Sequence, residues 1–168
     1  VHERAMNEVI LPTLRGMAAD GIPYTGFLYA GLMITPDGRV KTLEFNCRMG
    51  DPETQPIMMR LKSNLTQVLL AATRTGLDRV TLDWDPRVAL GVVLAAAGYP
   101  LSPRKGDAIS GLPSDASDRM VFHAGTTHAG DEVQVSGGRV LCVTALADTV
   151  ALAQQRAYEV VDGIRFDG

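Results

Sequence analysis

The sequence predicts an α+β fold, in which helices and antiparallel strand pairs alternate along 168 residues. Apolar residues at helical spacing predict a helix over residues 2–20. Two runs rich in β-formers, 24–35 and 40–45, flank a Pro-Gly turn and predict a hairpin. Residues 88–97 are almost all apolar, as in a buried strand. These three observations place a helix and strands in the first half of the chain and a buried strand in the second.

The N-terminal helix is predicted from an apolar series at positions Ala5, Val9, Ile10, Leu14 and Met17. Pro12 lacks a backbone donor, so we expect it to kink this helix. Gly21 is a suitable C-terminal stop.

The hairpin is predicted from its turn, which reads Thr35-Pro36-Asp37-Gly38. Proline sets its own φ and glycine tolerates a positive one, so the chain can reverse here. After the second strand, Thr54 or Asp51 is expected to cap a helix that runs to about Arg60. A further helix should follow, with its apolar face at Leu65, Val68, Leu69, Ala72 and Leu77 and with Gly76 near its end.

The second half predicts shorter strands. Loops are expected over residues 100–118, where proline and glycine are frequent, and a short strand over 120–124. Residues 133–135 and 139–147 are interpreted as a hairpin around Ser136-Gly137-Gly138. A final helix should be capped by Asp148 or Thr149 and stopped by Gly163.

Composition excludes several classes of function. The net charge is −3 and no basic run is present, so we expect no nucleic-acid partner. No apolar stretch reaches the length of a membrane span, so we expect no membrane association. The two cysteines, Cys47 and Cys142, are too few for a disulfide framework and favour a reducing, cytoplasmic location. Both are expected to be buried. Cys47 alternates with Glu44 and Asn46 and should face the opposite, packed side of the strand, and Cys142 lies in an apolar strand.

The candidate functional residues lie at the end of the second strand of the first hairpin. Alternate residues of a strand share a face, so Glu44 and Asn46 should point the same way, as should Arg48 if the strand continues that far. A carboxylate and an amide oxygen are ligands that Mg²⁺ accepts beside nucleotide phosphates. A guanidinium suits phosphate or carboxylate oxygens. The alternative is an ordinary exposed face, on which Arg48 pairs with a surface carboxylate.

The residues that follow are weaker candidates. Asp51 and Glu53 flank Pro52, and they could contact a substrate or simply place negative charge at a helix N-terminus. His123 is expected to be a hydrogen-bonded structural histidine. Arg139 follows two glycines and could reach a phosphate.

Residues 44–56 read Glu-Phe-Asn-Cys-Arg-Met-Gly-Asp-Pro-Glu-Thr-Gln-Pro, and this block resembles the signature of the phosphoribosylamine–glycine ligases of the ATP-grasp superfamily. Four further blocks resemble that family in order and spacing, namely residues 24–32, 91–100, 122–126 and 137–141. The resemblance therefore extends over essentially the whole chain. It implies the C-terminal part of an ATP-grasp domain over residues 1–86 and a small α+β domain over 87–168. The family's N-terminal part is expected to be missing.

The resemblance implies ATP-dependent ligation of glycine to 5-phosphoribosylamine in de novo purine biosynthesis, through a glycyl phosphate. It assigns Glu44 and Asn46 to Mg²⁺ (or Mn²⁺) and Arg48 to charge on the phosphoryl oxygens. Asp51, Glu53 and Thr54 become candidates for binding glycine or the amino sugar.

Two alternatives stay open. The first is another ATP-grasp carboxylate–amine ligase, which the block from Asp51 to Thr54 disfavours. The second is a binding domain that keeps only the fold, which the intact Glu44, Asn46 and Arg48 disfavour. Since phosphoryl transfer needs several elements at once, we expect the chain alone to be inactive.

Overall fold

The computed structural model describes residues 1–114 and 116–168, which form two compact units. The first unit comprises Val1–Gly50 and Asn64–Thr81, and the second comprises Asp51–Ser63 and Leu82–Gly168. Residue 115, within the predicted loop 100–118, lies outside the described residues. None of the helices in the described part of the chain has the length and hydropathy that a membrane span requires.

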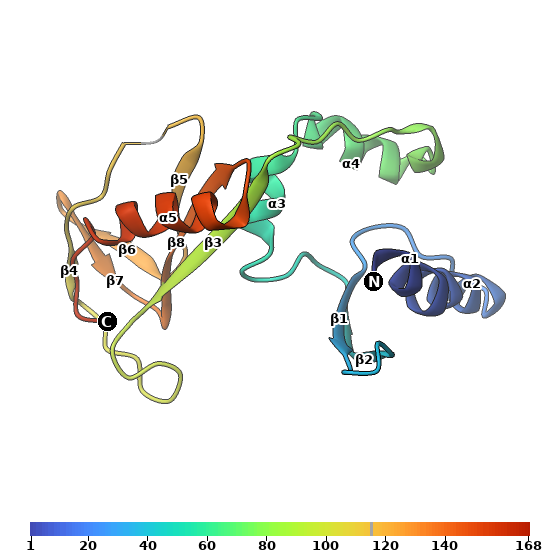
Figure 1. The fold of residues 1–168 in the computed structure, drawn as a ribbon, viewed down its shortest axis with the longest axis horizontal. Coiled ribbons are helices and arrows are strands. Elements are labelled where there is room, and N and C mark those ends of the chain that lie inside the picture. The colour runs from blue at the N-terminus through green and yellow to red at the C-terminus, as the bar shows by residue number, and fades with distance from the viewer. Residues whose placement is uncertain (115) are drawn as a thin grey trace. The chain divides into compact units, whose positions relative to one another are not determined.

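The first unit opens with one continuous helical segment, which confirms the prediction over residues 2–20 (Figure 1). It consists of α1 (His2–Ala5), the π-helical turn η1 (Met6–Ile10) and α2 (Leu11–Ala19). Pro12 stands in the first turn of α2. Because proline cannot donate to the preceding turn, the wider π-helical turn before it accommodates the missing hydrogen bond.

The first hairpin is formed by β1 (Tyr29–Ile34) and β2 (Val40–Asn46), which pair antiparallel as predicted. The turn closes where the N–H of Gly38, at φ +80°, donates to the carbonyl of Thr35 over 2.8 Å. The prediction that the first strand begins at residue 24 is wrong. Gly26 has a φ of +141°, which bends the chain before β1 begins.

The prediction that Cys47 is buried is also wrong, because its side chain is exposed. The strand face beside it carries Leu43 and Phe45, which are themselves 65% and 45% exposed. At this end of β2, Cys47 therefore lies beside exposed apolar residues and not in a core.

The helix predicted from Leu65 onward is α4 (Leu65–Thr73), capped by Asn64, whose side chain accepts from the N–H of Gln67. It ends before the predicted Leu77, which lies instead in the 3-10 turn η2 (Leu77–Arg79). The chain leaves the helix at Thr75, the one non-glycine residue with a positive φ among the described residues.

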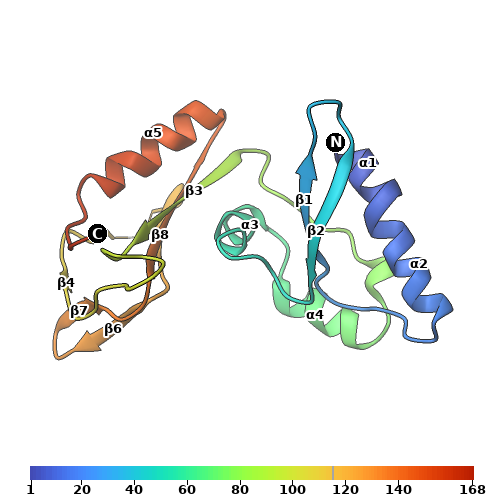
Figure 2. The ribbon, with the colours of Figure 1, turned by 90° about the horizontal axis from the view of Figure 1, so that it is seen from below.

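The second unit is built on a three-stranded antiparallel sheet with the order β3-β8-β5. Its strands are β3 (Val88–Ala95), β8 (Arg139–Ala147) and β5 (Arg119–His123). The helices α5 (Val150–Val161) and α3 (Thr54–Arg60) cover opposite faces of this sheet (Figure 2). Every residue of β8 after the first is buried, as expected for a central strand covered on both sides.

The two faces of β8 carry different side chains. Leu141, Val143 and Ala145 join a core cluster with residues of α5 that include Ala157. The alternating residues, Cys142 and Thr144, face the other way and are both buried. The predicted burial of Cys142 is thus confirmed, and burial raises the pKa of its thiol.

A second sheet has the order β4-β7-β6, and it shows that the hairpin predicted from residues 133–135 and 139–147 is wrong. Its strands are β4 (Ala108–Ile109), β7 (Glu132–Val135) and β6 (Thr126–Ala129). β7 pairs with β4 and β6, whereas β8 pairs with β3 and β5. Residues 136–138 carry the chain from one sheet to the other rather than reversing it.

This crossing depends on close backbone packing. The carbonyl of Gly125 accepts from the N–H groups of Ser136 and Gly137, over 2.8 and 3.1 Å. A Cβ on Gly125 would lie 2.7 Å from the Cα of Gly137 and 2.6 Å from the carbonyl oxygen of Arg139. The crossing therefore requires glycine at residue 125.

The predicted helix caps are partly right. Thr149 caps α5 by accepting from the N–H of Leu152 over 3.2 Å. The prediction of Asp51 or Thr54 as the cap of α3 is wrong, because Glu53 occupies the N-cap position. The Asp51 side chain is directed elsewhere, toward Arg139.

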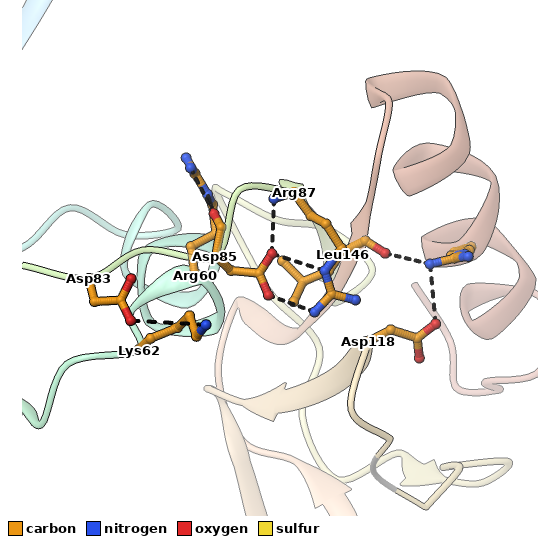
Figure 3. Close-up of polar contacts among 8 residues, drawn as sticks. Arg60, Lys62, Asp83, Asp85, Arg87, Asp118 and Leu146 are labelled. Carbon is orange, nitrogen blue, oxygen red and sulfur yellow. Dashed lines mark hydrogen bonds and ion pairs between the residues drawn. The ribbon is translucent and has the colours of Figure 1, made fainter.

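Arginine contacts join the segment after Leu82 to the end of α3 (Figure 3). Arg60 donates through Nε and Nη2 to the carbonyl oxygen of Asp85, over 3.1 and 3.0 Å. The Asp85 carboxylate accepts from Arg87 over 2.9 and 2.7 Å, and these bonds hold its pKa well below the usual range. Together with the packing of α3 against β3 and β8, these contacts hold α3 in the second unit.

Candidate functional site

The shared strand face predicted for Glu44 and Asn46 is confirmed by a direct hydrogen bond. Nδ2 of Asn46 donates to Oε1 of Glu44 over 3.1 Å. In the antiparallel register Glu44 stands opposite Gly31, and Asn46 stands opposite Tyr29. The end of β2 thus brings a carboxylate and an amide together.

A β-bulge precedes this pair. Gly31 pairs with Glu44, but the next residue, Leu32, pairs with Thr42, so Leu43 is an extra residue on β2. A bulge of this kind bends the strand and changes the direction of the side chains beside it. The alternation of β2 is therefore interrupted immediately before Glu44.

The two side chains fit a hard divalent cation. Cis ligands of an octahedral Mg²⁺ with bonds of about 2.1 Å are about 3.0 Å apart. The amide and carboxylate atoms of Asn46 and Glu44 are 3.1 Å apart. A half-turn of the amide exchanges its nitrogen for its oxygen, so a cation could be bound where the hydrogen bond now lies. Among the described residues, no group of three or more His, Cys, Asp or Glu side chains gathers.

Arg48 lies two residues beyond the end of β2, where strand alternation no longer sets its direction. Its guanidinium donates through Nη1 to the carbonyl oxygen of Met49 over 3.1 Å. Its side chain is exposed. The structure therefore places Arg48 near the pair along the chain, without a contact that joins it to them.

Asp51, Glu53 and Thr54 lie at the N-terminal end of α3, in the second unit. Asp51 is held by Arg139 at the start of β8. Nη1 of Arg139 donates to the Asp51 carbonyl oxygen over 3.0 Å, and Nη2 lies 3.4 Å from its carboxylate. Glu53 and Thr54 are the N-cap and the first residue of α3.

Sequence reasoning missed two relationships at these residues. Arg139 was a phosphate candidate, and no sequence signal joins it to Asp51, which is 88 residues away. The second relationship involves Gly31. A glycine inside a strand often marks a position where other atoms approach closely, so Gly31 could have indicated such a contact. His123 was correctly predicted to be hydrogen-bonded, since Nδ1 lies 3.1 Å from Oγ1 of Thr126.

Residues 1–54 match the family model "Phosphoribosylglycinamide synthetase, ATP-grasp (A) domain". Residues 89–168 match "Phosphoribosylglycinamide synthetase, C domain". The chain belongs to the phosphoribosylglycinamide synthetase family. The predicted fold class, an ATP-grasp portion followed by an α+β C-terminal domain, is thereby confirmed.

Relatives in the phosphoribosylglycinamide synthetase family are similar along the whole chain. A phosphoribosylamine–glycine ligase of Ralstonia nicotianae is 62% identical over 168 residues, which is all of this chain and 40% of the relative. The ligase of Yersinia pestis is 60% identical over 170 residues, again with 40% of the relative covered. The chain thus spans about 40% of the length of these relatives.

A solved structure of the family has the same fold. It is the crystal structure of the phosphoribosylamine–glycine ligase of Thermotoga maritima, which is 36% identical and superimposes with a TM-score of 0.83. The match covers 98% of this chain and 40% of that one. Both units described above therefore have counterparts in a solved structure of the family.

Proposed function

We propose that this chain forms part of an ATP-dependent ligase that joins glycine to 5-phosphoribosylamine and produces glycinamide ribonucleotide in purine biosynthesis. The observation that carries the proposal is the pair of Glu44 and Asn46, whose side chains meet on one strand face, with Nδ2 of Asn46 donating to Oε1 of Glu44 over 3.1 Å. Membership of the phosphoribosylglycinamide synthetase family supports this choice of reaction.

Glu44 and Asn46 would hold Mg²⁺ or Mn²⁺ through one carboxylate and one amide oxygen. When bound, the cation would neutralise charge on the phosphate oxygens of ATP. Arg48 would donate hydrogen bonds to phosphoryl oxygens as their charge develops. To do so its guanidinium would leave the carbonyl of Met49, which costs little because the side chain is exposed.

ATP would phosphorylate the carboxylate of glycine and release ADP. The amine of 5-phosphoribosylamine would then attack the glycyl phosphate, form the amide and expel phosphate. In this scheme Asp51, Glu53 and Thr54 bind glycine or the amino sugar through carboxylate and hydroxyl oxygens. No side chain needs to act as a nucleophile.

The remaining length of the family's proteins would supply the rest of the nucleotide site. We place the family's domain boundary near residue 86, with residues 1–86 in the ATP-grasp part and 87–168 in the C-terminal part. Residues 1–168 alone would bind ATP weakly and show no ligase activity, since catalysis of phosphoryl transfer depends on several positioned elements. A cytoplasmic location accords with the two unpaired cysteines.

The test uses the full-length enzyme that contains this chain. Glu44→Gln and Asn46→Leu should each lower glycine- and phosphoribosylamine-dependent ADP release by about 100-fold or more, as removal of one electrostatic stabiliser often does. Glu159→Gln, on the exposed side of α5, is the matched control and should keep normal activity. Near-normal turnover of both site variants at saturating Mg²⁺ would overturn the proposal.

A further inference from the structure

We infer that Gly31 is a positioning residue for Glu44, and that the absence of a side chain at residue 31 leaves the space that Cγ of this proposed metal ligand needs. The inference rests on the function proposed above and adds a residue to it. A Cβ built on Gly31 would lie 3.0 Å from Cγ of Glu44 and 3.8 Å from its Cδ. The side chain of Glu44 therefore passes directly over the backbone of β1.

The register explains why these two residues meet. Gly31 and Glu44 are cross-strand partners, and directly opposed residues of an antiparallel pair place their side chains on the same face. The bulge at Leu43 follows at once, so the strands are distorted beside this pair. Gly31 is not among the glycines with a positive φ. The backbone conformation thus allows alanine, and the reason for glycine is space.

A methyl group at residue 31 would fill that space from one side. The ring of Tyr29 lies 3.7 Å from the same Cβ position, so the methyl would stand between this ring and Glu44. A contact of 3.0 Å between carbon atoms is too short, and the flexible glutamate would move rather than the backbone. Its Oε1 would then leave the place where it meets Nδ2 of Asn46 at 3.1 Å.

The consequence is a loss of preorganisation rather than a loss of a ligand. Residues that orient metal ligands without touching the metal commonly change affinity by about 10- to 100-fold. We expect Gly31→Ala to be near the lower end of this range, because Glu44 remains present and can bind at the cost of a rearrangement.

The experiment measures Mn²⁺ affinity of the full-length enzyme by electron paramagnetic resonance, with a non-hydrolysable ATP analogue bound. Gly31→Ala should weaken Mn²⁺ binding about tenfold. Gly16→Ala in α2 is the matched control, since a Cβ there meets nothing within 4 Å, and it should bind as the wild type does. The double variant Gly31→Ala/Glu44→Gln should bind no more weakly than Glu44→Gln alone, because the effect acts through Glu44.

Failure of the role of Gly31 and failure of the proposed function would give different results in these measurements. If Glu44→Gln weakens Mn²⁺ binding and Gly31→Ala does not, the role of Gly31 is wrong and the proposed function stands. If Gly31→Ala weakens binding equally in the Glu44→Gln background, its effect is not through Glu44 and the inference fails. If Glu44→Gln itself binds Mn²⁺ normally, the proposed metal site fails first.

A crystal structure of the Gly31→Ala enzyme gives a second measurement that needs no metal. We expect a displaced Glu44 Cγ and a broken contact between Oε1 and Nδ2 of Asn46. A Glu44 side chain that keeps its original position beside Ala at residue 31 would overturn the inference.

Discussion

Arg139 holds Asp51 by both its main chain and its side chain. Nη1 donates to the Asp51 carbonyl oxygen over 3.0 Å, and Nη2 lies 3.4 Å from the carboxylate. One guanidinium thus joins the first residue of β8 to the loop that enters α3. Because the second unit's core contains β8, this contact ties the loop to its most deeply buried strand.

We expect Arg139→Gln in the full-length enzyme to raise the KM for glycine or for 5-phosphoribosylamine roughly two- to fivefold. Both partners are partly exposed, so the lost interaction is worth about 1 kcal/mol or less. The KM for ATP should not change, since Asp51 is proposed to contact the other substrates. Steady-state kinetics with each substrate varied in turn checks this.

Arg79→Gln is the control for that variant. Arg79 is highly exposed and lies 4.0 Å from Asp78, so its loss should leave all three KM values unchanged. Equal changes in the KM for ATP and for the other two substrates would contradict a local role for Arg139.

Gly125→Ala should destabilise the second unit. The new methyl group would meet backbone atoms at 2.6–2.7 Å, and backbone cannot move aside as a side chain can. We expect a loss of about 1–3 kcal/mol in the free energy of unfolding, as for other overpacked sites. Urea denaturation of the purified chain, followed by circular dichroism, measures it.

Gly137→Ala is the graded comparison, because its Cβ would lie 3.1 Å from the Cα of Gly125. Its loss of stability should be smaller. An equal or larger loss for Gly137→Ala would show that the crossing is not limited by the space at Gly125.

The two cysteines should react very differently with a thiol reagent. Cys47 is exposed, whereas Cys142 is buried in β8 and its thiol pKa is raised by that burial. Since the thiolate is the reactive form, Cys142 should stay unreactive at neutral and mildly alkaline pH. Native residues 1–168 should therefore label once rapidly with Ellman's reagent, and a second time only in denaturant.

Cys47→Ser decides which thiol is fast. It should abolish the rapid phase and leave the slow one. Rapid labelling that persists in this variant would mean that β8 is accessible and that the described core is wrong.

Local patterns predicted most of the secondary structure. The hairpin ending at Asn46 was predicted because turn chemistry and strand alternation act over a few residues. The cap at Thr149 was predicted for the same reason. The strand from Val88 was predicted because its run is almost all apolar, as in a strand that is buried on both faces.

The failures have a common physical cause, which is tertiary packing. The Gly137-Gly138 pair has the composition of a hairpin turn, yet it lies in the segment that connects β7 of one sheet to β8 of the other. Nothing local distinguishes a glycine needed for a positive φ from one needed for close packing. The exposure of Cys47 and the contact of Arg139 with Asp51 likewise depend on residues distant in sequence.

We propose above that Glu44 and Asn46 bind the catalytic cation. The most direct test is a crystal structure of the full-length enzyme with Mn²⁺ and an ATP analogue, with the metal located by anomalous scattering. We expect one Mn²⁺ within about 2.2 Å of a carboxylate oxygen of Glu44 and of the amide oxygen of Asn46. An ion that contacts the phosphates but neither of these two side chains would contradict it.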